Sequence, residues 1–224
     1  MTEPVLAATS NSNFVPALRF RLLTPVYDLA IRLTMREGLL RPLLIELLQL
    51  QPGTSVLDLG SGTGSLAIQI KHANPLVEVV GVDPDPDVLR IARTKAQRSA
   101  APVDFTQGSA EALPFEASRF DVVVSSLAFH HLMPGAKEEA LREAFRVLKP
   151  GGRLTIADFG PPRTRIGLAA TLPIRLLDGR TTWDNFFGRL PSMIQAAGFS
   201  DVAEVQRLRT VFGPVCFYAA MRPL

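Results

Sequence analysis

From residue 54 onward, short apolar runs alternate with longer segments of helical periodicity, and this alternation constrains the fold more than any other feature of the chain. Near-continuous apolar runs are typical of strands covered on both faces, and the amphipathic segments between them are typical of the covering helices. The expected strands are 54–59, 77–82, 103–106, 120–126 and 153–158, and the expected helices are 64–72, 86–99 and 136–148. Asp85 is the candidate N-cap of the second helix, and the apolar segment 165–177 is also expected to be helix-like. Strands joined through helices form parallel βαβ units, so the pattern predicts an α/β fold with a doubly wound sheet.

The end of the chain departs from this pattern. A helix is expected at 190–197, and two β-like runs follow at 201–210 and 214–221 with only a few residues between them. So short a connection forces a hairpin, and the last strand is therefore expected to run antiparallel to its neighbour. The complete expectation is a Rossmann-like, mostly parallel seven-stranded sheet with an antiparallel last strand and helices on both faces.

The regions outside the alternating core suggest additions to a single domain. Residues 1–13 are small and polar and are expected to form a flexible tail. Residues 14–50 are strongly apolar with interspersed arginines, which predicts an N-terminal helical cap, or lid, of two or three helices with Pro42 in a first turn. Residues 51–224 form the main domain, in which the apolar insertion at about 160–190 is expected to cover the substrate.

Composition excludes several classes of function. The formal net charge is +3 with a pI near 9.4, an excess too small to indicate a nucleic-acid partner. The single cysteine, Cys216, excludes an internal disulfide and any multi-cysteine metal site, and no metal is expected. No secretory signal and no membrane-spanning stretch are recognised, so a cytoplasmic location is expected. The apolar segments that contain arginines are compatible with peripheral contact with a membrane surface. The sequence does not distinguish a monomer from a homodimer.

A glycine-rich turn is expected at the end of the first strand, within "VLDLGSGTGSLA" at 56–67. The dinucleotide fingerprint G-x-G-x-x-G requires a third glycine at position 65, which is Ser65, and no Gly-Lys-Ser/Thr phosphate loop follows. What remains is an acid, Asp58, followed by G-x-G-x-G, and a second acid, Asp83, at the end of the second strand. A carboxylate at that second position can bind both hydroxyls of a ribose, because it has two acceptor oxygens.

These residues resemble the class I S-adenosylmethionine-dependent methyltransferases, and in particular the bacterial type 11 group that includes the quinone-biosynthesis C-methyltransferases. The resemblance covers roughly residues 20 to 221. Its motifs are "VLDLGSGTG", "VVGVDPDPDVLRIAR", "GSAEALPF", "FDVVVSSLAFHHL" and "RVLKPGGRLTIADF". The glycine turn alone is a weak signal, but five motifs in the family's order and spacing are a strong one.

The resemblance implies a binding site for S-adenosyl-L-methionine, with S-adenosyl-L-homocysteine as the product. The residues implied at the methionine end are Asp58, Gly60, Ser61 and Gly62, with Tyr27 closing over that end from the N-terminal helices. Asp83 is implied to bind the ribose, and Pro84 to pack on the adenine.

The adenine edge and the reacting sulfonium are also assigned by the resemblance. Ser109 and Ala110 flank the adenine edge, at a position where relatives usually have an aspartate that accepts the exocyclic amine. A serine there can accept only one hydrogen bond from the amine. Ser125 and Leu127, at the end of the fourth strand, are implied to border the sulfonium.

Adjacent histidines, His130 and His131, follow the fourth strand, where parallel sheets place their ligands. Methyl transfer from a sulfonium is an in-line displacement that depends mainly on positioning, and a base is required only if the acceptor must lose a proton. Neighbouring side chains point in different directions, so at most one of the two histidines is expected to face the methyl group and act as a base. The alternative is that both cap the following turn.

The function that follows from the resemblance is methyl transfer to a small, largely apolar acceptor such as a quinone precursor, a phenolic metabolite or a lipid. The aromatic cluster of Trp183, Phe186 and Phe187 in the insertion is consistent with such an acceptor. Two alternatives stay open: N-methylation of a phospholipid amine, and a catalytically inactive S-adenosylmethionine-binding regulatory protein.

Overall fold

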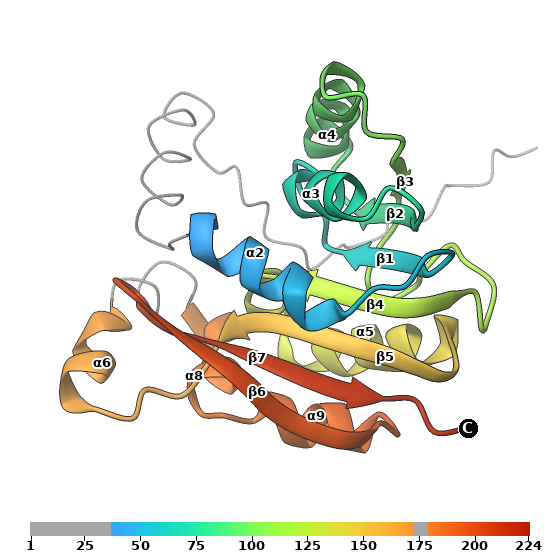
Figure 1. The fold of residues 1–224 in the computed structure, drawn as a ribbon. Helices are drawn as coiled ribbons and strands as arrows, with labels where there is room; N and C mark the ends of the chain where they lie inside the picture. Colours follow the sequence, from blue (N-terminus) through green and yellow to red (C-terminus); the bar gives the residue numbers. More distant parts are fainter. Residues whose placement is uncertain (1–36, 173–178) are drawn as a thin grey trace, which may run out of the picture.

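A computed structural model describes residues 37–172 and 179–224 of the 224-residue chain. The strands of this part form one seven-stranded sheet in the order β3-β2-β1-β4-β5-β7-β6 (Figure 1). Their bounds are β1 Ser55–Leu59, β2 Glu78–Asp83, β3 Asp104–Gln107, β4 Phe120–Ser126, β5 Leu148–Phe159, β6 Ser200–Thr210 and β7 Gly213–Met221. Only β7 runs antiparallel to its neighbours, β5 and β6. The predicted fold class is therefore confirmed.

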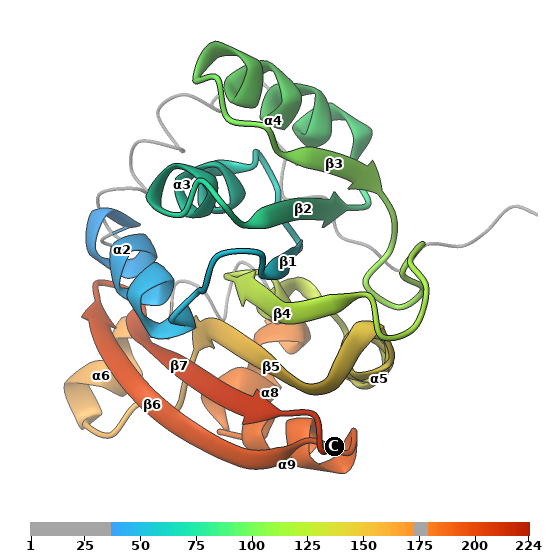
Figure 2. The ribbon, with the colours of Figure 1, turned by 45° about the vertical axis from the view of Figure 1, so that its right-hand side comes forward.

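Helices cover both faces of this sheet (Figure 2). The α-helices are α2 Glu37–Leu48, α3 Ser65–Ala73, α4 Pro86–Arg98, α5 Pro134–Val147, α6 Arg165–Ala170, α8 Trp183–Phe186 and α9 Leu190–Ala196, and the short 3-10 helices are η1 Phe129–His131 and η2 Gly179–Thr182. One hydrophobic core packs α2, α3 and α4 against the sheet, and a second packs α5 and α9 against it. The loops that follow β1, β2 and β4 are thereby held at one edge of the sheet.

Most predicted boundaries agree with the structure to within one or two residues, and Asp85 is the N-cap of α4, as the helix prediction required. Its Oδ1 accepts a hydrogen bond from the Asp87 N–H at 2.8 Å. The helix expected at 165–177 is described only as α6, because 173–178 lie outside the described residues. The flexible tail, Tyr27 and most of the N-terminal cap lie outside them as well.

The expected position of Pro42 is wrong. Pro42 lies inside α2 rather than in a first turn, where it cannot donate a hydrogen bond to the Gly38 carbonyl. The helix continues through it because Leu40, Leu44 and Leu48, spaced one turn apart, are all buried in the core. Burial of this stripe outweighs the local cost of the proline.

The start of the fifth strand also differs from expectation. Helix α5 ends at Val147, and β5 begins at once with Leu148 paired to Phe120, so that Pro150 and its glycines lie within the strand. The register shifts there, and regular pairing resumes between Val122 and Arg153. Such a bulge is a common way for a strand to accommodate proline and glycine.

Candidate functional site

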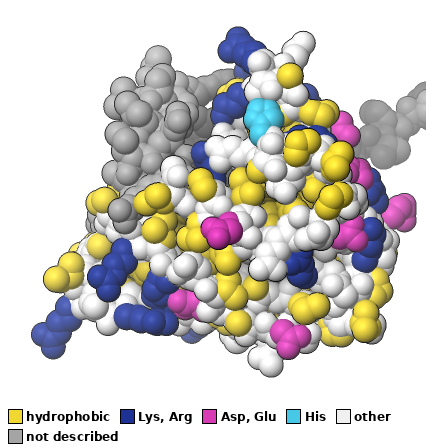
Figure 3. All heavy atoms as spheres, viewed as in Figure 1, with side chains coloured by type: hydrophobic (Ala, Val, Ile, Leu, Met, Phe, Trp, Pro, Cys, Tyr) yellow, Lys and Arg dark blue, Asp and Glu magenta, His cyan; other side chains and the backbone are white. Residues whose placement is uncertain are grey.

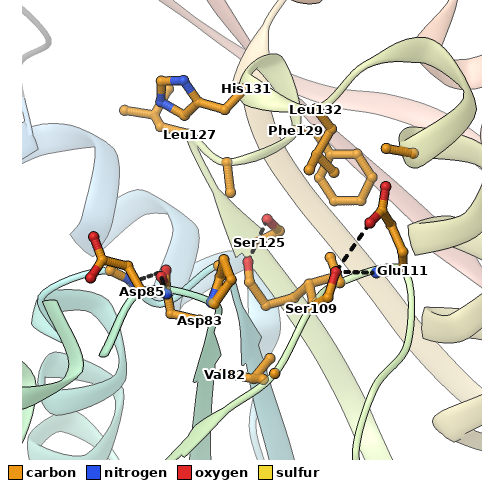
Figure 4. A pocket seen from close by; sticks show the side chains of 18 of the residues that line it. Val82, Asp83, Asp85, Ser109, Glu111, Ser125, Leu127, Phe129, His131 and Leu132 are labelled. Atoms are coloured by element: carbon orange, nitrogen blue, oxygen red, sulfur yellow. Dashed lines mark hydrogen bonds between the residues drawn. The ribbon is translucent and has the colours of Figure 1, made fainter. Parts of the chain in front are cut away.

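A cavity of about 250 Å³ opens at the carboxyl ends of β1, β2 and β4. Its walls come from the loops after these strands, from the loop after β3 and from the start of α5 (Figure 4). The predicted site residues that line it are Gly60, Gly62, Asp83, Pro84, Ser109, Ala110, Ser125, Leu127 and His131. This edge is where open parallel sheets bind their ligands, so the cavity is the candidate functional site.

The glycine turn after β1 lies close to two neighbouring segments. The N–H groups of Gly60 and Ser61 both donate to the Val82 carbonyl, at 2.9 and 3.0 Å, which holds the turn against β2. Gly60 has φ +75°, and a Cβ there would lie 2.5 Å from the Ala128 Cβ. Only glycine fits this point, because both the backbone conformation and the space exclude a side chain.

The third glycine of the turn has a different role. Gly64 precedes α3 with φ +74°, and a Cβ there would lie 2.6 Å from the Phe105 ring and 2.8 Å from the Ala92 Cβ. Gly64 does not line the cavity. It allows α3 to pack closely on α4 and β3 and thereby fixes the direction of the turn.

Asp83 ends β2 and faces the glycine turn. Its Oδ2 accepts the Gly62 N–H at 2.8 Å and its Oδ1 accepts the Asp85 N–H at 3.0 Å. Burial raises the pKa of this carboxyl, and the two N–H groups offset only part of that effect. Each oxygen retains a second lone pair, so the oriented carboxylate can still accept two further hydrogen bonds.

Asp58 and Ser61 do not line the cavity. Both are buried, and each is next in sequence to a residue that does line it. Burial raises the pKa of Asp58 to about 7, the nearby Asp83 charge adds to this, and the Ala67 N–H and Arg41 oppose it. Among the described residues, Asp58 Oδ2 and Ser61 Oγ have no hydrogen-bond partner. Unpartnered buried acceptors of this kind are rare, and here they adjoin a turn of bare backbone. They fit a ligand with a cationic amine.

Two residues at the end of β4 shape the floor and the rim of the cavity. Ser125 is fully buried, and its hydroxyl donates to the Leu59 carbonyl at 2.8 Å, which joins β4 to β1. Leu127 adopts φ +54°, fixed by its N–H bond to the Ala157 carbonyl at 2.8 Å. A left-handed backbone is uncommon for leucine, and such strain is frequently found at binding sites.

The histidines after β4 take different positions. His131 lines the cavity, whereas His130 is buried with its Nδ1–H donating to Asp158 Oδ1 at 2.9 Å and its backbone N–H donating to Oδ2 at 3.1 Å. The two rings are 4.0 Å apart. Helix α5 has Met133 as its N-cap without a side-chain bond, so neither histidine caps that helix.

The charges around the histidines set their ionisation. The charge of His130, together with burial, lowers the pKa of His131 to about 3, and Asp158 opposes this only in part. Burial raises the pKa of Asp158, but the charge and hydrogen bonds of His130 outweigh it, and the net pKa is lowered. His131 is therefore a neutral imidazole at physiological pH, available as a hydrogen-bond acceptor or donor.

A buried lysine near the histidines has no counterpart in the sequence-based predictions. Lys137 of α5 donates to the Thr181 carbonyl at 2.6 Å and to Asn185 Oδ1 at 2.8 Å, and its Nζ lies 3.6 Å from Asp184 Oδ2. Burial lowers the pKa of this lysine, and Asp184 opposes the shift. This set of residues, here called the Lys137 network, attaches the insertion to α5 beside η1.

The aromatic residues of the insertion do not form part of the described cavity. Phe186 is buried in the core, while Trp183 and Phe187 are 45% and 62% exposed. Among cavity residues, sequence reasoning missed Glu111, whose Oε2 accepts a hydrogen bond from the Ser109 hydroxyl at 3.2 Å. Glu111 follows Ser109 by two positions in the "GSAEALPF" motif, so proximity in the chain was a usable signal.

Fold and site together define an α/β protein with a cavity at the carboxyl ends of its parallel strands. Residues 56–152 match the family model described as "Methyltransferase domain". The predicted resemblance to the class I S-adenosylmethionine-dependent methyltransferases is confirmed by this match and by the relatives below.

Two curated relatives resemble this chain in sequence, and a solved structure resembles it in fold alone. Demethylmenaquinone methyltransferase of Thermus thermophilus is 40% identical over 145 residues, 64% of this chain and 65% of its own length. Ubiquinone/menaquinone biosynthesis C-methyltransferase UbiE of Ectopseudomonas mendocina is 40% identical over 121 residues, 53% of this chain and 46% of its own length. The chain thus spans about half to two thirds of these relatives.

A phosphoethanolamine N-methyltransferase from Haemonchus contortus, solved in complex with S-adenosyl-L-methionine, has the same fold, with a TM-score of 0.65 at 19% identity. The alignment covers 78% of this chain and 50% of that one.

Proposed function

We propose that the protein transfers a methyl group from S-adenosylmethionine to a small, largely apolar acceptor, and that the acceptor is a quinone precursor. The observation that carries the proposal is the cavity lined by the glycine turn and Asp83, beside the unpartnered Asp58 and Ser61 oxygens. The quinone-biosynthesis relatives at 40% identity support the choice of acceptor.

Each part of the cofactor has a suitable partner in the site. Asp83 offers two oriented lone pairs to the ribose hydroxyls, and Pro84 offers an apolar face to the adenine. Asp58 and Ser61 hold the amine end, and Gly60 and Gly62 leave the backbone bare for the carboxylate. When bound, S-adenosylmethionine supplies an electrophilic methyl group on a sulfonium. Tyr27 is proposed to close over the methionine end.

The protein's contribution to the reaction is then positioning. Ser125 and Leu127 fix the end of β4, and we propose that His131 accepts the hydrogen bond of the acceptor's hydroxyl and takes up its proton. A pKa of about 3 makes His131 a weak base, so its contribution to the rate is modest. His130 acts indirectly, since it is held by Asp158 and its ring contacts the His131 ring, with the centroids 4.0 Å apart.

The surface of the insertion suits an acceptor that resides in a membrane. In the space-filling view, hydrophobic and basic side chains lie together over α6 (Figure 3). Ile166 and Leu168 are exposed there, and Arg163 lies just before the helix. Apolar side chains flanked by arginine favour contact with an anionic lipid surface, and we propose a cytoplasmic protein that makes such contact. No helix within residues 37–172 and 179–224 is long and apolar enough to cross a bilayer.

The proposal is tested by calorimetric binding of S-adenosylhomocysteine followed by turnover with reduced demethylmenaquinone, with mass spectrometry of the product. We expect saturable binding that Asp83→Ala abolishes, and a methylated product. His131→Ala should lower kcat about tenfold and leave nucleoside binding unchanged, because general-base groups contribute to the chemical step. The control is His72→Ala, since His72 lies on α3 and is bonded to the Ser99 carbonyl.

Two outcomes would contradict the proposal. Absence of nucleoside binding removes the cofactor assignment. Binding without turnover on quinols, phenols and amines supports the alternative of a regulatory protein that binds S-adenosylmethionine without transferring its methyl group.

A further inference from the structure

One wall of the cavity carries a pair of polar side chains bonded to each other. In Figure 4, Ser109 and Glu111 lie on one side of the cavity, and Asp83 and Asp85 lie on the other. Ser109 Oγ accepts the Glu111 N–H at 3.3 Å, and the Ser109 hydroxyl donates to Glu111 Oε2 at 3.2 Å. A hydroxyl has one donor and two acceptor sites, so Ser109 keeps one lone pair for a ligand. Glu111 offers a carboxylate beside it.

Three other polar side chains of the cavity, those of Asp83, Asp85 and Ser125, have different partners. Asp83 is held by two backbone N–H groups and is assigned to the ribose. Asp85 caps α4, and in Figure 4 its carboxylate points away from Ser109. The Ser125 hydroxyl hydrogen is donated to the Leu59 carbonyl. Ser109 and Glu111 are thus the polar side chains of this wall that offer acceptors to a polar edge of the base.

We infer that Glu111, together with Ser109, accepts the exocyclic amine of the cofactor's adenine and makes the site selective for a 6-amino purine. This inference rests on the proposed function. The amine has two N–H donors, of which one can bond the remaining Ser109 lone pair and the other the Glu111 carboxylate. A charged acceptor binds N–H more strongly than a hydroxyl does, so Glu111 supplies most of the selectivity.

The same arrangement rejects a 6-oxo purine. Such a base presents a carbonyl oxygen where adenine presents its amine, and that oxygen would face the Glu111 carboxylate without a donor between them. Selectivity of this kind comes from the unfavourable pairing as much as from the favourable one.

The test compares S-adenosylhomocysteine with its deaminated analogue, S-inosylhomocysteine, by calorimetry on the full chain. The wild type should bind the amino form at least about tenfold more tightly, as expected for one hydrogen bond to a charged group. Glu111→Gln should reduce that ratio about tenfold, because an amide can also donate to the 6-oxo group. Glu116→Gln is the matched control, since Glu116 is exposed nearby and does not line the cavity.

Ser109→Ala provides a second variant, which should reduce the ratio by a few-fold while Glu111 remains. Thermal melting of each variant confirms that it is folded. The inference is overturned if Glu111→Gln leaves the ratio unchanged or weakens both nucleosides equally. A wild-type protein that binds neither nucleoside refutes the proposed function and this inference with it, whereas binding with an unaltered ratio refutes this inference alone.

Discussion

At the scale of single residues, the Asp58 carboxyl combines deep burial with an incomplete set of partners. It is 1% exposed, its Oδ2 has no partner among the described residues, and its pKa is raised to about 7. Burying an ionised carboxylate is costly, so the free protein favours the protonated form in acid. A cationic amine placed beside Asp58 would reverse that preference. Stability and binding therefore make opposite demands on this residue.

The pH dependence of Asp58→Asn tests this conflict. Because the folded pKa exceeds the unfolded value of 3.8, the contribution of Asp58 to stability is complete below about pH 4 and is lost as pH rises through about 7. With about 1.4 kcal/mol per pKa unit, the wild type loses a few kcal/mol across this range relative to the variant. Urea unfolding at pH 5, 6, 7 and 8 measures the difference.

The ionisation of Asp58 should affect ligand binding in the opposite direction to its effect on stability. The affinity of the wild type for S-adenosylhomocysteine should increase from pH 6 to pH 8 as Asp58 ionises, and Asp58→Asn should bind more weakly with a flat profile. If the unfolding free energies of the two proteins differ by a constant amount at every pH, Asp58 does not titrate near neutrality.

At the scale of elements, the glycine turn is fixed by its packing against neighbouring segments. A side chain at position 60 is excluded because Ala128 lies too close, and one at position 64 is excluded because α4 and β3 pack closely against the start of α3. The direction of α3 therefore determines where the backbone of the turn meets the cavity.

Gly64→Ala tests this packing, with Gly53→Ala as its control. Both glycines have positive φ, +74° and +83°, but a Cβ at Gly53 has nothing within 4 Å. Gly53→Ala should cost about 1–2 kcal/mol for the left-handed backbone alone. Gly64→Ala adds overpacking against Phe105 and Ala92, so its loss of unfolding free energy should be larger by about 1–3 kcal/mol. Equal losses in urea unfolding would show that α3 adjusts without strain.

Elements were the level at which sequence reasoning was most accurate. The bounds of β4 were predicted correctly, and the Asp85 cap followed from its place before Pro86, because periodicity and capping are local. The early start of β5 was missed because it depends on pairing with Phe120, a residue distant in the chain. Pro42 was misplaced because burial of leucines overrode a local preference.

At the scale of the whole molecule, the site could be predicted only in part. Motif spacing located the glycine turn, Asp83 and the loop of Ser109, which line one cavity. Which of the two histidines lines the cavity was not predictable, because Asp158, which holds His130, lies 28 positions after it. The Lys137 network was missed for the same reason, since Asn185 lies 48 positions after Lys137. Contacts between distant segments leave no periodic signal in the sequence.

The Lys137 network joins the insertion to the core, so removing Lys137 should weaken this connection. Lys137→Ala removes the donor to the Thr181 carbonyl and to Asn185, and it removes one of the two cations that lie beside the buried Asp184 in the described part of the chain, the other being Arg189 at 3.4 Å. Breaking a buried pair from one side costs about 3–5 kcal/mol. Lys149→Ala, which breaks the half-exposed pair with Asp121, should cost at most about 1 kcal/mol.

The loss of stability in Lys137→Ala should be confined to the insertion and to the side of the site where the acceptor is proposed to bind. Since η1 contacts η2, opening of 179–189 would displace His131 and raise the KM for the acceptor, while the affinity for S-adenosylhomocysteine stays unchanged. Hydrogen exchange should increase in 179–189 in Lys137→Ala and not in Lys149→Ala. The double variant Lys137→Met with Asp184→Asn should recover part of the stability, because it removes both charges together. If Lys137→Ala is no less stable than Lys149→Ala and its exchange pattern is unchanged, the network does not hold the insertion, and other contacts must fix the acceptor side.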